Sequence, residues 1–589
     1  MSRLIARNGL YNMKKFNKDK YLKKLKFKKY NRYLYIGIPC LLVLLAGIYF
    51  AYSKFSVFKE EEVVRTTVGD FISGDIVITP YIDGEYSKTI PGKNDGYVVE
   101  KIVCDNDASA SWDNDSWGIM VTNLTKRTKC NVYFKKGIKI GNLTAFVDEL
   151  GKCPTINSDG TVKVTSAEST DGYVCSASDA YGTSYYYRGN VTNNYVKFGK
   201  WPDDTPTGAV DGYGDPYDSL EDCKNFSDSD NCVELARAGK DMYWRIVRIN
   251  GDGTVRVIYD GTSAHTNGES STDGQIGMSA FNHDTDDNMY IGYMYGNRDA
   301  IVEATSSSNS TSFGNTDTYY IAKEYTYDAI TGRFTLKNPI AVLGSAMTSD
   351  YVGYYTFGSR SSDISYSYVY KIFEVTAGDS RADVKYGYVR YGTSSKEVAQ
   401  TNTNDSAIKT YLDNWYKTNI SGTENEQYLA DNIFCNDRSI SAGKPSGYTN
   451  LEYGTETTAY RWYYFANSSY NSKVMLTCPQ QNDAFTVSDT TNGNGALTYP
   501  IGLITTDEVI LAGGWNAKNN GYYLYSGLWY WVSSPNYFDR IAFVMRVFSD
   551  GNASYGLAVN NDAWVRPVLN LSPDILQNGD GSMENPYTP

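Results

Sequence analysis

Three short acidic segments contain the residues whose types and spacing most directly suggest chemistry. Hard cations such as Ca²⁺ bind several carboxylate and carbonyl oxygens supplied by one loop. None of the three segments has the bidentate Glu that completes an EF-hand, and one of them also reads as a hairpin turn. The sequence therefore leaves the metal ligands unknown, keeps calcium open and indicates no other cofactor. The candidate residues are Asp284, Asp286 and Asp287 in NHDTDDN, Asp228 and Asp230 in SDSDN, and Asn250 and Asp252 in INGDGT.

Catalytic side chains are harder to identify. His265 and His283 are the only histidines, and neither lies in a GxSxG-like or HExxH pattern. The paired carboxylates of a glycosidase meet only in the folded chain and leave no fixed spacing, so the sequence does not exclude them. We therefore name no catalytic residue and expect a protein that is not an enzyme. An extracellular carbohydrate-active enzyme with paired carboxylates is the alternative.

The nine cysteines divide into Cys40, which lies in an apolar run, and eight others. An even number in an exported chain favours disulfides, although the sequence alone allows many pairings. Neighbouring cysteines fall within the same local β-like segments, which favours sequential pairing. Zinc is disfavoured because no pair has CxxC spacing and histidines are so few. The expected disulfides join Cys104 to Cys130, Cys153 to Cys175, Cys223 to Cys232 and Cys435 to Cys478.

Residues 33–52 form an uncharged run with aromatic ends, long enough to cross a bilayer core of about 30 Å as a helix. Twelve Lys or Arg and one acid precede it in residues 1–32, so the positive-inside rule places the N-terminus in the cytoplasm. A cleaved signal peptide would have a shorter basic region and small residues at the cleavage site. We therefore expect an uncleaved signal anchor, which makes this a single-pass protein of the cell membrane with an extracellular C-terminal ectodomain.

The rest of the chain is strongly acidic. Without residues 1–32, the totals of 55 basic and 67 acidic residues fall to 43 and 66, a net charge of −23. A chain of that charge is a poor partner for nucleic acid. The full sequence has 54 Tyr, which with abundant Gly, Ser, Thr, Asn and Asp are typical of exposed β-sheet with polar turns and of an adaptable recognition surface.

Strand patterns dominate the ectodomain, and two amphipathic segments predict helices within it. SAIKTYLDNWYKTNI (406–420) has apolar residues at helical spacing, and TTDEVILAGGW (505–515) starts with capping Thr and ends at Gly. Helices among strands favour an α+β fold over a pure sandwich. The expected divisions are a basic tail at 1–32, the anchor at 33–52, a stalk at 53–67, a small β-sandwich module at 68–137, and a strand-rich domain at 138–589 with insertions at about 200–242 and 317–392.

Two parts of the chain resemble known families. The stretch from IPGKNDGYVVEKIVC to CNVYF resembles a small juxtamembrane β module of Firmicutes surface proteins, where it acts as a spacer. The C-terminal runs YYLYSGLWYWVSSP and FVMRVFSDGNASYGLAVNNDAWVRPVLNL resemble an uncharacterised extracytoplasmic domain of the same group of proteins. That domain is similar to the C-type-lectin-like fold of formylglycine-generating enzymes and of variable proteins made by diversity-generating retroelements.

The resemblance implies a lectin-like fold and structural roles for Trp529, Trp531, Arg566 and Pro567. Oxidase activity is not implied, because formylglycine-generating enzymes use cysteines near the C-terminus and no cysteine follows Cys478 here. The resemblance instead implies ligand binding by C-terminal loops, and hence adhesion to a glycan or protein on another surface. The expected ligand-binding residues are Asn536, Tyr537, Asp539, Arg540, Asn552, Tyr555, Asn560, Asn561 and Asp562.

Overall fold

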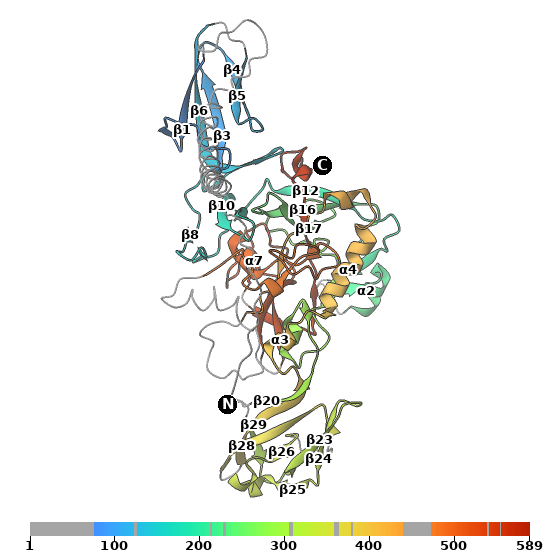
Figure 1. The fold of residues 1–589 in the computed structure, drawn as a ribbon. Helices are drawn as coiled ribbons and strands as arrows, with labels where there is room; N and C mark the ends of the chain where they lie inside the picture. Colours follow the sequence, from blue (N-terminus) through green and yellow to red (C-terminus); the bar gives the residue numbers. More distant parts are fainter. Residues whose placement is uncertain are drawn as a thin grey trace, which may run out of the picture. The chain divides into compact units, whose positions relative to one another are not determined.

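The structure is a computed structural model that describes residues 76–122, 126–211, 215–227, 231–304, 310–358, 365–378, 381–439, 473–538, 541–553 and 555–589. The expected anchor at 33–52 and stalk at 53–67 lie outside these residues, as do Asp228, Asp230, Asp539 and Arg540. Within the described ranges, no helix is both long and apolar enough to cross a membrane. The described residues are rich in strands and contain a few short helices, in agreement with the expected α+β class (Figure 1).

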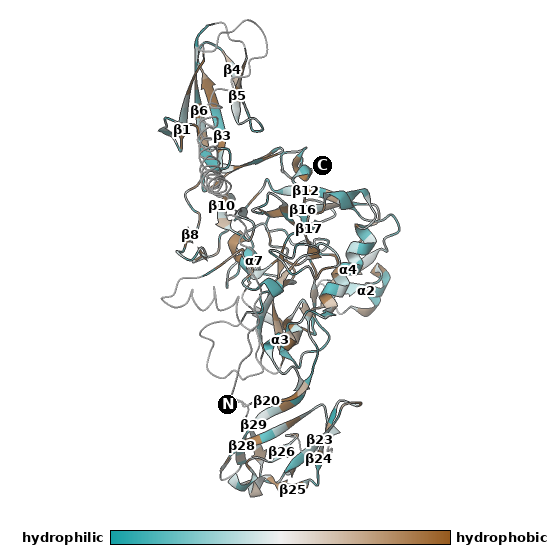
Figure 2. Ribbon diagram, in the orientation of Figure 1, coloured by the Kyte–Doolittle hydropathy of each residue, from teal (hydrophilic) through white to brown (hydrophobic). Residues whose placement is uncertain are grey.

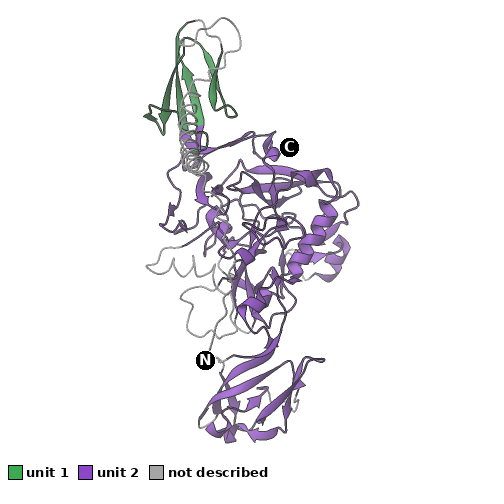
Figure 3. Cartoon of the chain, viewed as in Figure 1, with its two compact units in different colours: residues 1–95, 99–134 green, residues 96–98, 135–589 purple. Residues whose placement is uncertain are grey.

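The described chain divides into two compact units, one of residues 76–95 and 99–134 and one of residues 96–98 and 135–589 (Figure 3). The smaller unit is built on a sheet in the order β2-β1-β6-β3, with β4 and β5 as a separate hairpin. Trp112 packs edge-on against Trp117 and Phe134, with ring centroids 5.3 and 5.2 Å apart. The strands are β1 (Ile76–Ile82), β2 (Glu85–Tyr86), β3 (Tyr97–Cys104), β4 (Ser109–Asp113), β5 (Gly118–Thr122) and β6 (Thr128–Ile140).

A seven-stranded sheet forms the centre of the larger unit, in the order β10-β11-β16-β17-β38-β33, with β12 paired to β16. Its longest hairpin, β16 to β17, turns at Asn250 to Thr254, where Gly253 has a φ of +87° that favours glycine. Hydrophobic residues gather in these central strands (Figure 2). The strands are β10 (Tyr173–Ser178), β11 (Thr183–Arg188), β12 (Tyr195–Lys200), β16 (Asp241–Ile249), β17 (Val255–Gly261), β33 (Ile501–Gly502) and β38 (Val568–Leu571).

Both predicted helices are present. In α4 (Ala407–Asn419), the Ser406 side chain caps the first turn, and Ile408, Leu412 and Trp415 are buried. In α7 (Thr506–Ala512), Thr505 and Glu508 form a reciprocal capping box, and Gly513 ends the helix with a φ of +123°. The caps that the sequence indicated therefore set the ends of both helices.

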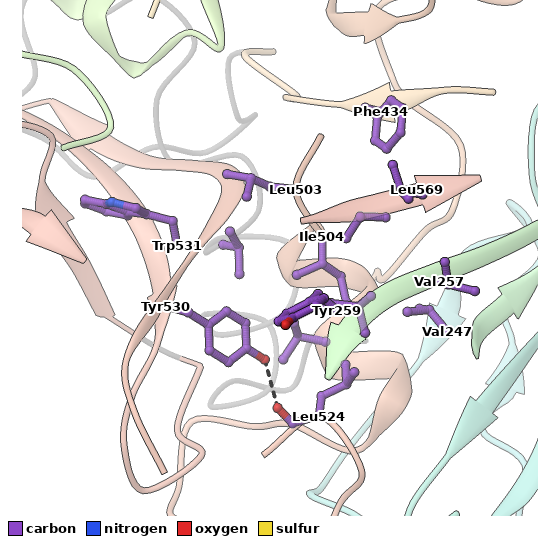
Figure 4. Close-up of a cluster of buried hydrophobic side chains, with 14 of the residues drawn as sticks. Val247, Val257, Tyr259, Phe434, Leu503, Ile504, Leu524, Tyr530, Trp531 and Leu569 are labelled. Carbon is purple, nitrogen blue, oxygen red and sulfur yellow. Dashed lines mark hydrogen bonds between the residues drawn. The ribbon is translucent and has the colours of Figure 1, made fainter. Parts of the chain in front are cut away.

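A second sheet of five strands contains most of the C-terminal segment, in the order β18-β37-β34-β35-β36. Its first long strand packs on the central core, where the Tyr530 hydroxyl donates to the carbonyl of Leu524 at 3.1 Å (Figure 4). Trp531, Leu503, Ile504 and Leu569 belong to the same cluster of buried side chains. The strands are β18 (Met278–Ala280), β34 (Tyr530–Phe538), β35 (Ala542–Val547), β36 (Tyr555–Ala558) and β37 (Asp562–Trp564).

Two groups of elements lie in the regions where insertions were expected. The first contains β13 (Gly208–Val210), β14 (Pro216–Tyr217), α2 (Leu220–Phe226) and β15 (Val233–Leu235). The second begins at Ala300 and has its own cores, one around Phe313 and Ile372 and one around Phe334 and Val369. Its strands are β20 (Ala300–Ala304), β21 (Ser310–Gly314), β22 (Thr318–Ala322), β23 (Glu324–Asp328), β24 (Arg333–Lys337), β25 (Ile340–Leu343), β26 (Tyr355–Thr356), β27 (Ser365–Tyr366), β28 (Tyr368–Ala377) and β29 (Arg381–Gly392).

Short elements connect these parts. They are β7 (Leu143–Phe146), β8 (Thr155–Ile156), β9 (Val162–Lys163), η2 (Asn288–Ile291), β19 (Met294–Tyr295), η3 (Gly344–Ala346), η4 (Ser349–Tyr351), α3 (Lys396–Ala399), β30 (Asn404–Asp405), η5 (Glu424–Tyr428), β31 (Phe434–Cys435), η7 (Gln481–Asp483), β32 (Ala484–Phe485) and η8 (Pro573–Leu576).

The four expected disulfides are confirmed. Cys104 pairs with Cys130, Cys153 with Cys175, Cys223 with Cys232, and Cys435 with Cys478, with S–S distances of 1.96 to 2.04 Å. Each closes a local segment, as expected when neighbouring cysteines fall in adjacent strands or turns.

We expect non-reducing peptide mapping of the purified full-length chain to return these four linked peptide pairs. The same digest after reduction and alkylation is the control and should return these eight cysteines in unlinked peptides. Recovery of any crossed pair would contradict the arrangement of strands around it.

Candidate functional site

The expected ligand-binding residues that the structure describes lie on the C-terminal five-stranded sheet and in its turns. Asn536 and Tyr537 lie near the end of β34, at the tip of the β34–β35 hairpin. Tyr537 is half-buried and stacks on Phe543, with ring centroids 4.5 Å apart. Asn536 is buried instead, and its side chain lies against β36 so closely that a Cβ at Gly556 would collide with it. Of these two residues, only Tyr537 presents part of its side chain to solvent.

Asn560 and Asn561 are exposed in the turn between β36 and β37, and Asp562 is exposed as the first residue of β37. The residue before them is held at the hairpin tip, because the Val559 N–H donates to the carbonyl of Ala542 at 3.0 Å. The start of this turn and the tip of the β34–β35 hairpin are therefore neighbours.

Asn552 and Tyr555 belong to the other end of the hairpin. β35 runs from Ala542 to Val547, and β36 returns antiparallel to it, so the turn between them lies away from the hairpin tip. Asn552 is half-buried in that turn, and its carbonyl accepts from the Phe548 N–H at 2.7 Å. The structure thus divides the expected face into two groups at opposite ends of β35.

The four residues expected to be structural differ in how deeply they are buried. Trp531 is completely buried, and its indole N–H donates to the carbonyl of Ser279 at 2.8 Å. Arg566 is 1% exposed and donates to the carbonyls of Tyr259 and Leu524, while the Pro567 carbonyl accepts from the Tyr259 N–H. Trp529 differs from these three, because part of its ring reaches solvent.

Arg546, which sequence reasoning did not single out, lies over Trp529. Its guanidinium carbon is 4.1 Å from the centroid of the Phe548 ring and 5.8 Å from that of Trp529. Within the described parts of the chain, its guanidinium has no hydrogen bond and no ion pair, and its Nε is enclosed without an acceptor. Burial lowers the pKa of Arg546 from its ordinary value. The available signal was a single charge in the otherwise apolar run AFVMRVF.

Comparison of the chain with known proteins gave no match. No protein-family model matches the chain, and no match was found among the curated proteins or the solved structures. The lectin-like resemblance therefore remains a proposal drawn from the C-terminal motifs.

The acidic segment at 284–287 is engaged by cationic and hydroxyl groups. Asp286 pairs with Arg298. Asp287 pairs with Arg390 and accepts from the backbone N–H and the hydroxyl of Thr393, each at 3.0 Å. Among the described residues, no group of three or more His, Cys, Asp and Glu side chains could hold a metal ion. In the INGDGT segment, Asp252 accepts from Thr254 within the hairpin turn.

A buried charge cluster lines a cavity beside α7. Glu508 lies 3.0 Å from the Arg248 guanidinium and 2.6 Å from that of Arg256, and Arg248 also pairs with Asp179 at 2.8 Å. Burial alone would raise the pKa of Glu508, but the two arginines outweigh it and lower that pKa. A general acid needs a raised pKa, so Glu508 is suited to holding the fold rather than to protonating a substrate.

His265 lies in a tight polar loop after β17. Its Nε2 is 2.8 Å from Asp273 and 3.0 Å from the Ser271 hydroxyl, and its Nδ1 is 3.3 Å from Glu269. Burial lowers the pKa of His265, but the hydrogen bond to Asp273 and the charges of Asp260 and Asp273 outweigh it and raise the pKa to about 9. A protonated imidazole does not act as a general base, so this cluster resembles a triad in its contacts only.

The raised pKa makes stability depend on pH. The unfolded His265 titrates near pH 6.5, so its contribution is fully present below that value and is lost as pH rises through about 9. We expect the melting temperature of the wild-type chain to fall between pH 7 and pH 9.5 by more than that of His265→Gln. Scanning calorimetry across this range measures the difference, and parallel curves for the two proteins would contradict the assignment.

Proposed function

We propose that this chain is a membrane-anchored binding protein of the cell surface, which recognises a glycan or a protein through its C-terminal sheet. The observation that carries the proposal is the group of half-buried aromatic and exposed amide side chains beside the end of β34, a strand that is otherwise buried. Tyr537 at the hairpin tip and Asn560 and Asn561 in the neighbouring turn are examples. Recognition residues are commonly presented in this way, on turns held by a rigid scaffold.

The electrostatics of the cavity beside α7 support binding over catalysis. The cavity beside α7 is lined by Glu508, whose pKa is lowered by Arg256 and Arg248. A hydrolase of the glycosidase type needs one carboxyl group that keeps its proton, and this carboxylate is neutralised by cations instead. The acidic loop at 284–287 is likewise used for internal ion pairs.

An array of glycans and purified surface proteins, probed with the full-length chain in detergent, tests the proposal. We expect binding to a restricted set of ligands, and loss of that binding in the triple variant Asn560→Ala, Asn561→Ala and Asp562→Ala. The melting temperature of this variant should be unchanged, because all three side chains are exposed. Binding that is equal for the variant and the wild type would move the site away from this turn.

The anchor is a separate part of the proposal and has its own test. If residues 33–52 are an uncleaved anchor, the mature protein keeps its basic N-terminus and sediments with membranes. Intact-mass analysis of the membrane fraction should give the mass of the whole chain. A soluble species that begins near Tyr52 or Ser53 would contradict the anchor.

A further inference from the structure

We propose that Arg546 is the carboxylate receptor of the C-terminal sheet and that its ligand is a sugar bearing a carboxylate group. This inference rests on the proposed binding function, adds a subsite at the end of β35 opposite the β34–β35 hairpin tip, and names the ligand class of that subsite. A guanidinium presents parallel N–H donors that match the two oxygens of a carboxylate, which makes arginine the usual residue for such recognition.

The first support is the absence of an internal partner. Other buried arginines of the larger unit are engaged: Arg248 and Arg256 by Glu508, Arg390 by Asp287, and Arg566 by backbone carbonyls. Arg546 has no hydrogen bond and no ion pair within the described ranges, and its Nε is enclosed. A partly buried cation left in this state costs free energy, and an anionic ligand would recover it.

The second support is the aromatic frame around the guanidinium. The Phe548 and Trp529 rings lie 4.1 and 5.8 Å from the guanidinium carbon, and both are half-buried. The Trp529 indole N–H is a second enclosed donor without an acceptor. Aromatic rings beside a fixed cation hold it in one orientation and offer C–H-rich ligands a surface for packing. A sugar carries both groups, since its ring has C–H faces and its carboxylate can bind the guanidinium.

The third support is an observation that favours a sugar over a protein as the ligand. From residue 473 onward, the described part of the chain has one exposed large hydrophobic side chain, Ile541. A stable protein interface needs an apolar core of several such residues. The described part of this surface therefore lacks the apolar core that a protein partner would need.

The test measures binding of the methyl glycosides of N-acetylneuraminic acid and glucuronic acid to the full-length chain in detergent, by isothermal titration calorimetry. Each acid is paired with its carboxamide, which keeps the shape and removes the charge. We expect binding of at least one acid, and at least about tenfold weaker binding of its carboxamide. The two acids distinguish a sialic-acid source from a uronic-acid source. Equal affinity for acid and carboxamide would overturn the proposal.

Two variants connect the effect to Arg546. Arg546→Met should abolish acid binding, and Arg546→Lys should weaken it by roughly tenfold, because lysine keeps the charge but loses the bidentate geometry. If Arg546→Met fails to fold, Arg546→Lys decides, and unchanged affinity in a folded variant overturns the proposal. Arg333→Met, at an exposed arginine on β24, is the matched control and should bind as the wild type does.

The same experiment separates this inference from the proposed function. If neutral glycans bind on the array and Arg546→Met binds them unchanged, the carboxylate receptor is wrong and the binding function stands. If a poly-glutamate peptide binds Arg546 more tightly than both acids, the ligand is a protein carboxylate and the sugar assignment is wrong. If the array shows no ligand of either kind, the binding function itself fails.

Discussion

Glu508→Ala is expected to lower the free energy of unfolding of the larger unit by about 3 to 5 kcal/mol. The reason is that Glu508 neutralises both Arg248 and Arg256, which lie 3.0 and 2.6 Å from it and are almost completely buried. Removing the carboxylate leaves two guanidinium groups inside the protein, with Asp179 as the remaining acid next to Arg248. The same substitution also removes one half of the capping box that starts α7.

Urea unfolding followed by tryptophan fluorescence measures this change, with the wild type and a surface variant beside it. Glu374→Ala is the matched control, because Glu374 also pairs with a cation, Lys385 at 2.9 Å, but both side chains are about half exposed. A surface pair of this kind contributes at most about 1 kcal/mol. Equal shifts for Glu508→Ala and Glu374→Ala would show that the buried cluster does not hold the core together.

Local chemistry explains what the sequence could predict. The two helices follow from apolar spacing and from caps within the same segment, such as Ser406 before α4 and Thr505 before α7. The disulfides were predictable for the same reason, since the eight ectodomain cysteines pair consecutively along the chain. These features depend on short stretches of chain, and a sequence displays short stretches directly.

The charge pairs were not predictable, because they depend on contacts between distant segments. Asp287 and Arg390 are 103 residues apart, and Glu508 and Arg248 are 260 apart. Asp287 was a calcium candidate because other acidic residues are next to it in the sequence. In the folded chain it forms an ion pair with the guanidinium of Arg390 instead. Arg546 was missed for the opposite reason, since the role proposed for it rests on the lack of an acid near it among the described residues.

The division of the expected binding face has a similar origin. Asn552 and Asn560 are close in sequence and alike in chemistry, so motif reasoning placed them on one surface. β36 runs between them, however, and carries the chain from one end of β35 to the other. To see that Asn552 and Asn560 lie in different turns, one needs the boundaries of β36. The Gly and Asn residues around Ala553 to Ala558 do not mark these boundaries in the sequence.

Asp287→Ala is expected to destabilise the base of the inserted sheet by about 3 to 5 kcal/mol. Asp287 is completely buried and satisfies Arg390, which is 1% exposed at the base of β29. It also accepts from the N–H and hydroxyl of Thr393, just after β29, and from the Met289 N–H at the start of η2. Without the carboxylate, the ring of Phe538, 5.7 Å away, is the one remaining contact among the described residues that favours the charge of Arg390.

Hydrogen exchange followed by mass spectrometry measures where this loss occurs. We expect faster exchange in peptides covering β20 and β29, because these strands pair next to Arg390 and an unpaired buried cation favours their local opening. Peptides around the Cys104–Cys130 disulfide should exchange as in the wild type, since they belong to the other compact unit.

Asp286→Ala is the adjacent control, because its pair with Arg298 is about one-third exposed and should contribute less to stability. If exchange rises equally throughout the larger unit, Asp287 stabilises the whole unit rather than the base of the insertion. If exchange does not change at all, the ion pair contributes nothing to holding the inserted sheet in place.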